Sequence, residues 1–278
     1  MKYLNVGCGS RFHPAWTNID ATSISPSVLV HDCRAGIPFP DHSFDVVYHS
    51  HVLEHFSKIE ALRFVQECFR VLRPEGIIRV AVPDLECLAR LYLCAIDKAA
   101  GGDTQWQHNY DWLMLELYDQ TVRNRSGGGM IDYLKQDPLP NGAFLFERGG
   151  GEIRRILQAI RKPTRPKLTR LPLIEEITRW ILAIPHAALR RCLAKLLGPK
   201  GREALEIGQF RLAGEIHQWM YDRYSLARLL GQVGFQNPQR RGPAESLIPD
   251  WTSYHLDTES DGSTYKPDST YMEAVKPQ

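Results

Sequence analysis

Five short runs of strand-forming residues fall within the first 82 positions, and this pattern constrains the fold more than any other feature of the sequence. The runs cover residues 3–6, 16–20, 28–32, 44–48 and 77–82. Before the fifth run, apolar residues from Ile59 to Leu72 recur every three or four positions, which predicts a helix over 58–72 with one face against a core. Because strands that alternate with crossover helices form parallel sheets, the predicted fold class is α/β.

The alternation stops after Pro83 and resumes near the end of the chain. There the sequence predicts a helix over 225–234 and strands over 235–241 and 269–275. The region before this helix has glycine clusters and helical stretches but no convincing strand. The predicted domains are a seven-stranded core from residues 1–98 and 215–278, and a mainly helical insertion over 99–214.

The composition is typical of a soluble globular protein, with 43% hydrophobic residues, 24% charged residues and a mean hydropathy of −0.32. Residues 180–189 form the longest apolar run, which Pro185 and His186 interrupt; a membrane span needs roughly 20 apolar residues. The six cysteines form no Cys-x-x-Cys pair, and no signal segment precedes the first strand. These features predict a cytoplasmic protein without a disulfide framework or a zinc ribbon.

Positive charge is concentrated in one segment. The whole chain has a net charge of +2, but residues 151–202 hold 13 basic residues against three acidic ones, a net charge of +10, so the rest carries −8. Within this segment, residues 180–197 place leucines on one side of a predicted helix and Arg190, Arg191 and Lys195 on another. Such a helix either packs on the core as a lid or rests on an anionic membrane surface. Nucleic acid is not the predicted partner, because no aromatic pattern interleaves the basic residues.

Glycines and acids stand at the ends of the first three predicted strands. Gly7, Cys8 and Gly9 follow the first strand, where glycine lets the backbone approach a ligand closely, and Asp20 ends the second, where a carboxylate can accept both hydroxyls of a ribose. Asp32 closes the third strand and is followed by Cys33, a position from which a carboxylate and an amide can bond an adenine edge. The alternative is a tight turn with solvated aspartates.

Several motifs together resemble the class I S-adenosylmethionine-dependent methyltransferases of the type 11-like group. They are Leu4-Asn-Val-Gly-Cys-Gly-Ser10, Asn18-Ile-Asp20, the segment from Ile37 to Asp45, His51-Val-Leu-Glu-His55 and Arg70-Val-Leu-Arg-Pro-Glu-Gly76. Val82 to Glu86 and the closing residues 269–275 resemble a subgroup found near surface-glycan or natural-product genes. The resemblance implies a Rossmann-like seven-stranded sheet, S-adenosyl-L-methionine as the cofactor and, in the helical insertion, a cover over the acceptor site.

The resemblance also implies roles for individual residues. Gly7, Cys8 and Gly9 would line the methionine and ribose side of the cofactor, and Asp20 would hold the ribose. Asp32 and Cys33 would hold the adenine, and His49 and Ser50 would face the reacting methyl group. Two departures from the family pattern are Arg11 in place of the third glycine and the short segment Ser10–Ala15, which leaves no room for the usual first crossover helix.

Transfer of a methyl group from a sulfonium needs mainly in-line positioning, with a base only where an O–H or N–H must lose its proton. The candidate catalytic residues are His51, His55 and His217, each of which could instead be a hydrogen-bonded structural histidine. The expected acceptor is an oxygen or nitrogen atom of a small molecule or glycan, while the oligomeric state is left open.

Two other functions are compatible with parts of the sequence. His51 to His55 match the H-x-x-E-H pattern of inverted zinc peptidases, with both histidines on one face if a helix begins here. Because that function does not explain the glycine turn or the strand-end acids, we predict no metal site. The missing crossover helix and the large insertion are also compatible with a catalytically inactive interaction module built on the same fold.

Overall fold

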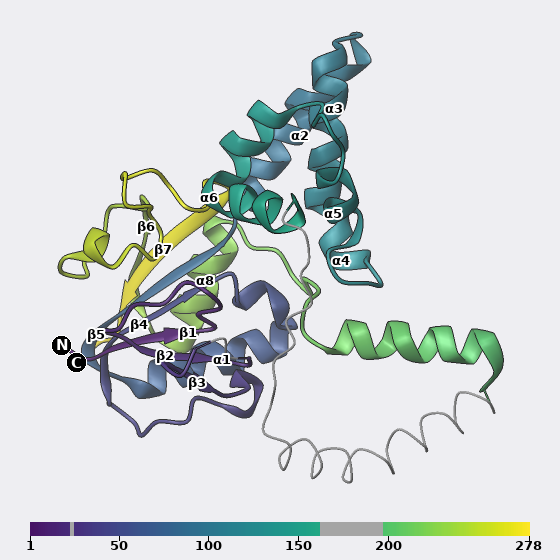
Figure 1. Cartoon of the computed structure of the whole chain (residues 1–278). Helices are drawn as coiled ribbons and strands as arrows, with labels where there is room; N and C mark the ends of the chain where they lie inside the picture. Colours follow the sequence, from purple (N-terminus) through teal and green to yellow (C-terminus); the bar gives the residue numbers. More distant parts are fainter. Residues whose placement is uncertain (23–24, 162–196) are drawn as a thin grey trace.

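A single mixed sheet of seven strands forms the centre of the computed structural model, which describes residues 1–22, 25–161 and 197–278 (Figure 1). The strand order is β3-β2-β1-β4-β5-β7-β6. The strands are β1 (Tyr3–Val6), β2 (Thr17–Asp20), β3 (Val28–Val30), β4 (Phe44–Ser50), β5 (Leu72–Pro83), β6 (Gln236–Arg241) and β7 (Ser269–Val275). The first five are parallel, and β7 lies antiparallel between β5 and β6. The predicted α/β class and the seven-stranded sheet are confirmed.

Helices α1 (Lys58–Val71) and α8 (Arg223–Val233) pack on one face of the sheet. Helix α1 begins with a capping box in which Ser57 and Glu60 bond each other's backbone N–H groups. Helix α8 ends at Gly234, whose left-handed φ of 111° suits glycine. Both helices lie within two residues of their predicted bounds, because capping and periodicity are local signals.

Residues 10–16, all of them described, contain no helix between β1 and β2, as the short spacing predicts. Side-chain amides hold this connection: Asn5 donates to the carbonyl of Arg11 at 3.1 Å, and Asn18 donates to those of His13 and Trp16 at 3.0 and 2.8 Å. An aromatic cluster covers the face of the sheet that does not carry α1 and α8. Its ring contacts join Tyr3, Trp16, Tyr48, Trp251 and Tyr254.

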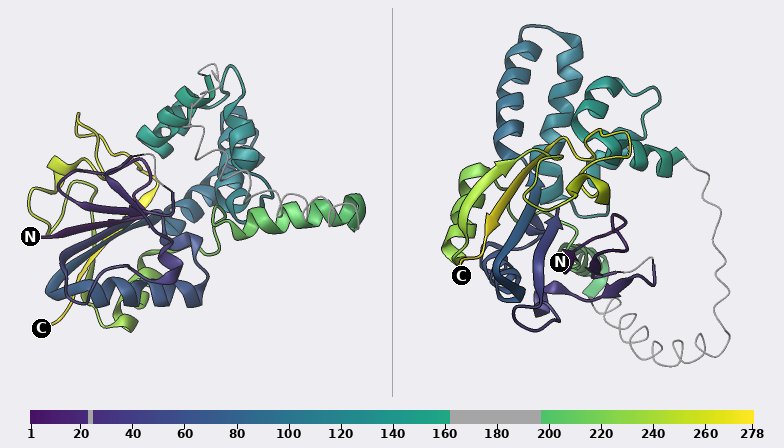
Figure 2. Two further views of the ribbon diagram at one scale, coloured as in Figure 1. Left: turned by 60° about the horizontal axis from the view of Figure 1, so that its bottom comes forward. Right: turned by 90° about the vertical axis from the view of Figure 1, so that its left-hand side faces the viewer.

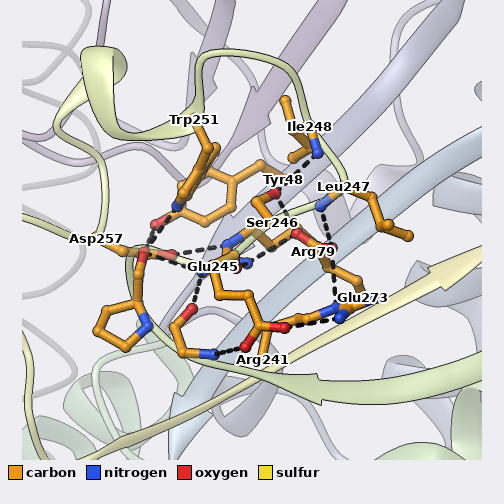
Figure 3. Close-up of polar contacts among 12 residues, drawn as sticks. Tyr48, Arg79, Arg241, Glu245, Ser246, Leu247, Ile248, Trp251, Asp257 and Glu273 are labelled. Carbon is orange, nitrogen blue, oxygen red and sulfur yellow. Dashed lines mark hydrogen bonds and ion pairs between the residues drawn. The ribbon is translucent and has the colours of Figure 1, made fainter.

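A fully buried arginine holds the C-terminal loop, the segment between β6 and β7, against the sheet (Figure 3). Arg79 of β5 donates to Asp257 at 2.9 Å and to Glu273 at 2.8 Å. It also donates to the backbone carbonyls of Gly242, Pro243 and Glu245. Two carboxylates and three carbonyls surround one guanidinium. Their hydrogen bonds to the guanidinium offset the free-energy cost of removing these charges from water.

Helices also form a separate group beyond the last residue of β5 and the first residue of β7. The group lies at the end of the sheet opposite the two termini (Figures 1 and 2). The group comprises α2 (Leu85–Ala100), α3 (Thr104–Met114), the π-helical turn η3 (Leu115–Asp119), α4 (Gln120–Val122), α5 (Gly128–Leu134) and α6 (Gly142–Arg161). It has its own apolar core, which includes Trp112, Leu145 and Ile153. Residues 197–212 form a further helix. No helix in the described ranges is both long and apolar enough to cross a membrane.

The basic amphipathic stretch predicted over 180–197 lies outside the described residues except for its last position, so Arg190, Arg191 and Lys195 have no described structure.

Candidate functional site

The turn after β1 depends on its two glycines. Gly7 has a φ of +65°, and a Cβ atom there would meet Val52 Cγ2 at 2.3 Å. Gly9 has a φ of +52°, but nothing lies within 4 Å of the position of its missing Cβ. Gly7 is therefore required by packing, whereas Gly9 leaves open space over the backbone, as a close approach of a ligand requires.

Asp20 lies opposite this open backbone. Its Oδ2 accepts a 2.8 Å hydrogen bond from the N–H of Gly9, and its Oδ1 accepts one of 2.9 Å from the N–H of Thr22. Beside it, burial and the charge of Asp20 raise the pKa of the Cys8 thiol to about 12, so this cysteine is neutral. A loop amide, a thiol and a carboxylate thus meet at the ends of β1 and β2.

A cavity of about 280 Å³ opens over this loop. Six residues singled out from the sequence line it: Gly7, Cys8, Gly9, Asp20, Ser50 and His51. Charged side chains that sequence analysis missed also line it. Among these, Lys266 lies 3.3 Å from Glu152, and Arg155 bonds the hydroxyl of Ser10.

Asp32 and Cys33, the two residues expected at the adenine, do not line this cavity. Asp32 is exposed and accepts from the N–H of Arg34 at 3.0 Å, as the cap of a short 3₁₀ turn, η1 (Cys33–Ala35). Burial, together with the charges of Asp32 and Asp20, raises the pKa of the Cys33 thiol to about 12.

His49 is the clearest correction to the sequence analysis. Side chains alternate along β4, so Tyr48 and Ser50 face the small cavity while His49 faces α1, where its ring packs 5.0 Å from that of Phe64. The His49 side chain is fully buried, and its ring nitrogens have no hydrogen-bond partner among the described residues. The expectation that His49 faces the reacting methyl group is wrong.

A second cavity, of about 610 Å³, lies between the sheet and the helical group. Its apolar wall includes Trp112, Leu134 and Ile153. A buried ion pair, Arg148 to Glu116 at 2.5 Å, forms part of its polar wall. The two cavities have three lining residues in common, namely His51, Glu152 and Lys266.

All three candidate catalytic histidines line this larger cavity. His51 has a left-handed φ of 54°, a strained conformation for a residue other than glycine, and its Nε2 bonds Ser269 Oγ at 2.7 Å. His55 Nδ1 bonds the carbonyl of Ile216 at 3.2 Å, and the rings of His55 and His217 lie 4.9 Å apart. Burial lowers the pKa of each of these imidazoles, so all three are neutral at pH 7.

The H-x-x-E-H segment does not form the helix that an inverted zinc peptidase requires. A 3₁₀ turn, η2, covers Leu53–His55, and α1 begins only at Lys58. His51 and His55 therefore do not share a helical face.

Glu54 is buried next to these histidines, and the sequence analysis gave it a role only in the zinc-peptidase alternative. Its side chain is 1% exposed, and burial raises its pKa to about 8. Glu54 Oε1 lies 3.4 Å from His51 Nδ1, but neither carboxylate oxygen makes a hydrogen bond within the described structure. A buried carboxyl without a partner is unusual outside functional sites.

Comparison with known proteins finds similarity in the N-terminal part of the chain. Residues 4–80 match the family model described as a methyltransferase domain. A "probable S-adenosylmethionine-dependent methyltransferase" of Mycolicibacterium smegmatis is 46% identical over 54 residues, which are 19% of this chain and 20% of that protein. A protein of the same description from Mycobacterium tuberculosis is 46% identical over 50 residues, 18% of each chain. The chain thus spans about a fifth of the length of the curated relatives it matches.

Among solved structures, a Thermotoga maritima protein described as an S-adenosylmethionine-dependent methyltransferase, possibly acting on histamine, aligns with a TM-score of 0.41. The identity is 10%, and the alignment covers 99% of this chain and 82% of that one.

Proposed function

We propose that this protein, whose residues 4–80 match the model of a methyltransferase domain, is an S-adenosylmethionine-dependent methyltransferase that transfers a methyl group to an oxygen or nitrogen atom of a small molecule or glycan. One observation carries the proposal: the cavity over the glycine loop and the larger cavity meet at His51. Two ligands bound in these cavities would come together beside this residue, as group transfer requires.

The residues around the smaller cavity fit S-adenosyl-L-methionine. The open backbone at Gly9 leaves room for the ribose, whose hydroxyls Asp20 would accept. Lys266 and Glu152 offer opposite charges for the carboxylate and ammonium groups of the methionine part. Asp32 and Cys33 would hold the adenine at the exposed end. When bound, the sulfonium supplies an already activated methyl group.

The larger cavity would receive the acceptor. Its wall comes mainly from the segment between Trp112 and Ile156, so residues 99–214 would act as the cover over the acceptor site and residues 1–98 and 215–278 as the catalytic core, with helix α2 packed against the cover. The apolar wall at Trp112 and Ile153 would exclude water and hold an apolar part of the acceptor.

His51 would accept the proton of an O–H or N–H acceptor. Its Nδ1 lies 3.4 Å from Glu54 Oε1, which orients the ring. The Ser269 hydroxyl, which is hydrogen-bonded to His51 Nε2, also lies 3.5 Å from Asp268 Oδ1. Rotation of this hydroxyl toward Asp268 would free the His51 nitrogen for the acceptor. His55 and His217 line only the acceptor cavity and stand farther from the junction.

Calorimetry with S-adenosylhomocysteine and S-adenosylmethionine tests the proposal. We expect the wild type to bind both, and Asp20→Ala to weaken binding at least about tenfold, since charge-assisted hydrogen bonds contribute about 1.5 to 3 kcal/mol. Asp20→Asn removes the charge but keeps the size of the side chain, so its affinity separates the effect of the lost charge from that of a changed glycine loop. Asp97→Asn, on an exposed turn of α2, is the matched control and should bind as the wild type does.

Absence of binding by folded wild-type protein at millimolar ligand would overturn the proposal. It would favour the alternative of a catalytically inactive interaction module.

A further inference from the structure

A buried cluster of two histidines and one glutamate lies next to the acceptor cavity, which both of its histidines line. Potential ligand atoms of Glu54, His55 and His217 all lie within 4.8 Å of one another. Glu54 and His217 are 1% and 6% exposed. The methyl-transfer proposal uses one member of this cluster, Glu54, as the neighbour of His51 Nδ1, and gives no role to His55 or His217.

Hydrogen bonds to backbone carbonyls hold the segment of His217 next to that of Glu54 and His55. Residue Gln218, next to His217, donates its N–H to the carbonyl of Glu54 at 2.7 Å and its side-chain amide to the carbonyl of His55 at 3.1 Å. His217 itself donates its N–H to the carbonyl of Gln120 at 2.9 Å. The segment before α8 is therefore fixed against η2, and the cluster does not depend on a mobile side chain.

Each side chain offers a free donor atom. Nδ1 of His55 bonds the carbonyl of Ile216, which assigns its proton to Nδ1 and leaves a lone pair on Nε2. A backbone carbonyl that accepts from the far nitrogen is the usual support of a metal-bound histidine. Both carboxylate oxygens of Glu54 have no hydrogen-bond partner within the described ranges, and the His217 ring lies 4.9 Å from that of His55.

Charged groups around the cluster are already paired. Arg123 lies 3.3 Å from Glu215, and Lys266 lies 3.3 Å from Glu152. Asp268 also lines the cavity. The cations that would repel a metal ion are thus compensated by neighbouring carboxylates, while the Glu54 carboxyl has no cation of its own.

We propose that Glu54, His55 and His217 bind one divalent transition-metal ion, with Zn²⁺ as the reference ion. Two imidazoles and one carboxylate are a ligand set that zinc and similar ions accept, and three protein ligands leave at least one position open toward the cavity. This set differs from that of the H-x-x-E-H peptidases, in which both histidines of the motif bind the metal and the glutamate does not.

The use of the ion rests on the proposed function. At the open position it would bind the oxygen of a hydroxylated acceptor and favour its deprotonation. The proton passes to His51, the oxygen electron pair forms the new O–CH₃ bond, and the S–CH₃ bond breaks with its electron pair left on sulfur. The products are the methyl ether, S-adenosylhomocysteine and protonated His51.

Metal content of the full-length protein tests the site without any need for the acceptor. Protein stripped with a chelator is equilibrated with Zn²⁺, dialysed and analysed by elemental mass spectrometry and X-ray absorption. We expect one ion per chain, with nitrogen and oxygen ligands and no sulfur. We expect Glu54→Gln and His217→Ala to bind Zn²⁺ at least about tenfold more weakly. His108→Gln, at an exposed position of α3, is the control that should bind one ion.

Near-ultraviolet circular dichroism of the metal-free variants establishes that each one is folded. Wild-type protein that binds no Zn²⁺, variants that bind as tightly as the wild type, or sulfur in the coordination shell would each overturn the site. Binding of S-adenosylhomocysteine is measured on the same samples. Loss of that binding with zinc retained would overturn methyl transfer and leave the metal site standing.

Discussion

His49 and Glu54 are both buried polar residues without hydrogen-bond partners in the described structure, but their settings differ. His49 faces α1 and packs on Phe64 inside the main apolar core, away from both cavities. Glu54 lies beside three histidines, His51, His55 and His217, which line the larger cavity. His49 has no such neighbours, whereas the histidines beside Glu54 can share a proton or a metal ion with it.

Replacement of His49 by leucine should stabilise the protein, and more so in acid. Burial lowers the pKa of His49 to about 3 from an unfolded value of about 6.5. Between these values only the unfolded state binds the proton, so the wild type loses up to about 1.4 kcal/mol per pH unit from this residue as the pH falls below 6.5. His49→Leu removes that loss, and above pH 7 it removes only an unpaired buried polar group.

Urea unfolding of wild type and His49→Leu at pH 7.5, 6.5 and 5.5 measures this difference. A stability gap between the two proteins that stays constant over this range would contradict a buried neutral imidazole.

Residues of the small cavity were predictable where a local rule applies. A glycine after a first strand and an acid after a second one have few alternative roles, and this logic found Gly7, Gly9 and Asp20. His49 was misplaced because the alternation of side chains along β4 was not applied to it. Glu152 and Lys266 were missed because they reach the site from segments more than 100 residues away, and no local pattern marks them.

At the scale of elements, contacts of Arg11, here called the tether, hold the segment between β1 and β2 where the crossover helix is missing. Arg11, which stands where the family has its third glycine, donates to the carbonyl of Thr258 at 2.6 Å and to Glu259 at 3.3 Å. Its guanidinium lies 4.0 Å from the centre of the Tyr265 ring. The glycine loop is therefore held by the C-terminal loop, which Arg79 in turn fixes to the sheet.

Arg11→Ala should weaken both the fold and the cofactor site. The variant loses two hydrogen bonds and a cation–π contact, which together stabilise the fold by about 1 to 3 kcal/mol. Because the glycine loop is then less ordered, we expect affinity for S-adenosylhomocysteine to fall about three- to tenfold. Thermal unfolding and calorimetry measure the two effects. Arg63→Ala, on the exposed side of α1, should change neither quantity, and unchanged affinity in Arg11→Ala would show that the tether does not order the loop.

The sequence predicted the strands and the helices α1 and α8 well, because apolar periodicity and caps act within a few residues. It could not predict that two cavities meet at His51. This junction depends on how α6 and the loop before β7 pack against the end of β4, and such packing depends on contacts between distant segments.

At the scale of the whole molecule, positive charge is distributed unevenly along the chain. The acceptor cavity has its charges in pairs, such as Arg148 with Glu116 and Lys266 with Glu152. The unbalanced positive charge instead lies in residues 151–202, with a net charge of +10. An acceptor carried by a lipid or a membrane-bound glycan would be met at a surface that attracts such a segment.

We therefore expect the protein to sediment with anionic vesicles but not with neutral ones. Basic residues near a leucine-rich face combine modest apolar insertion with attraction to anionic lipid, and neither contribution suffices alone. Raised salt should release the protein, since exposed charges are screened over about 8 Å at physiological ionic strength. Changing Arg190, Arg191 and Lys195 to glutamate should abolish sedimentation.

A variant with the same change in charge elsewhere separates the segment from the net charge. Arg63, Arg90 and Arg223 are exposed positions outside residues 151–202, and their joint replacement by glutamate should leave vesicle binding in place. Equal loss of binding in both triple variants would mean that net charge alone attracts the protein. If the wild type stays in the supernatant with anionic vesicles at low salt, the basic segment instead serves as a lid on the core, and acceptors would reach the cavity from solution.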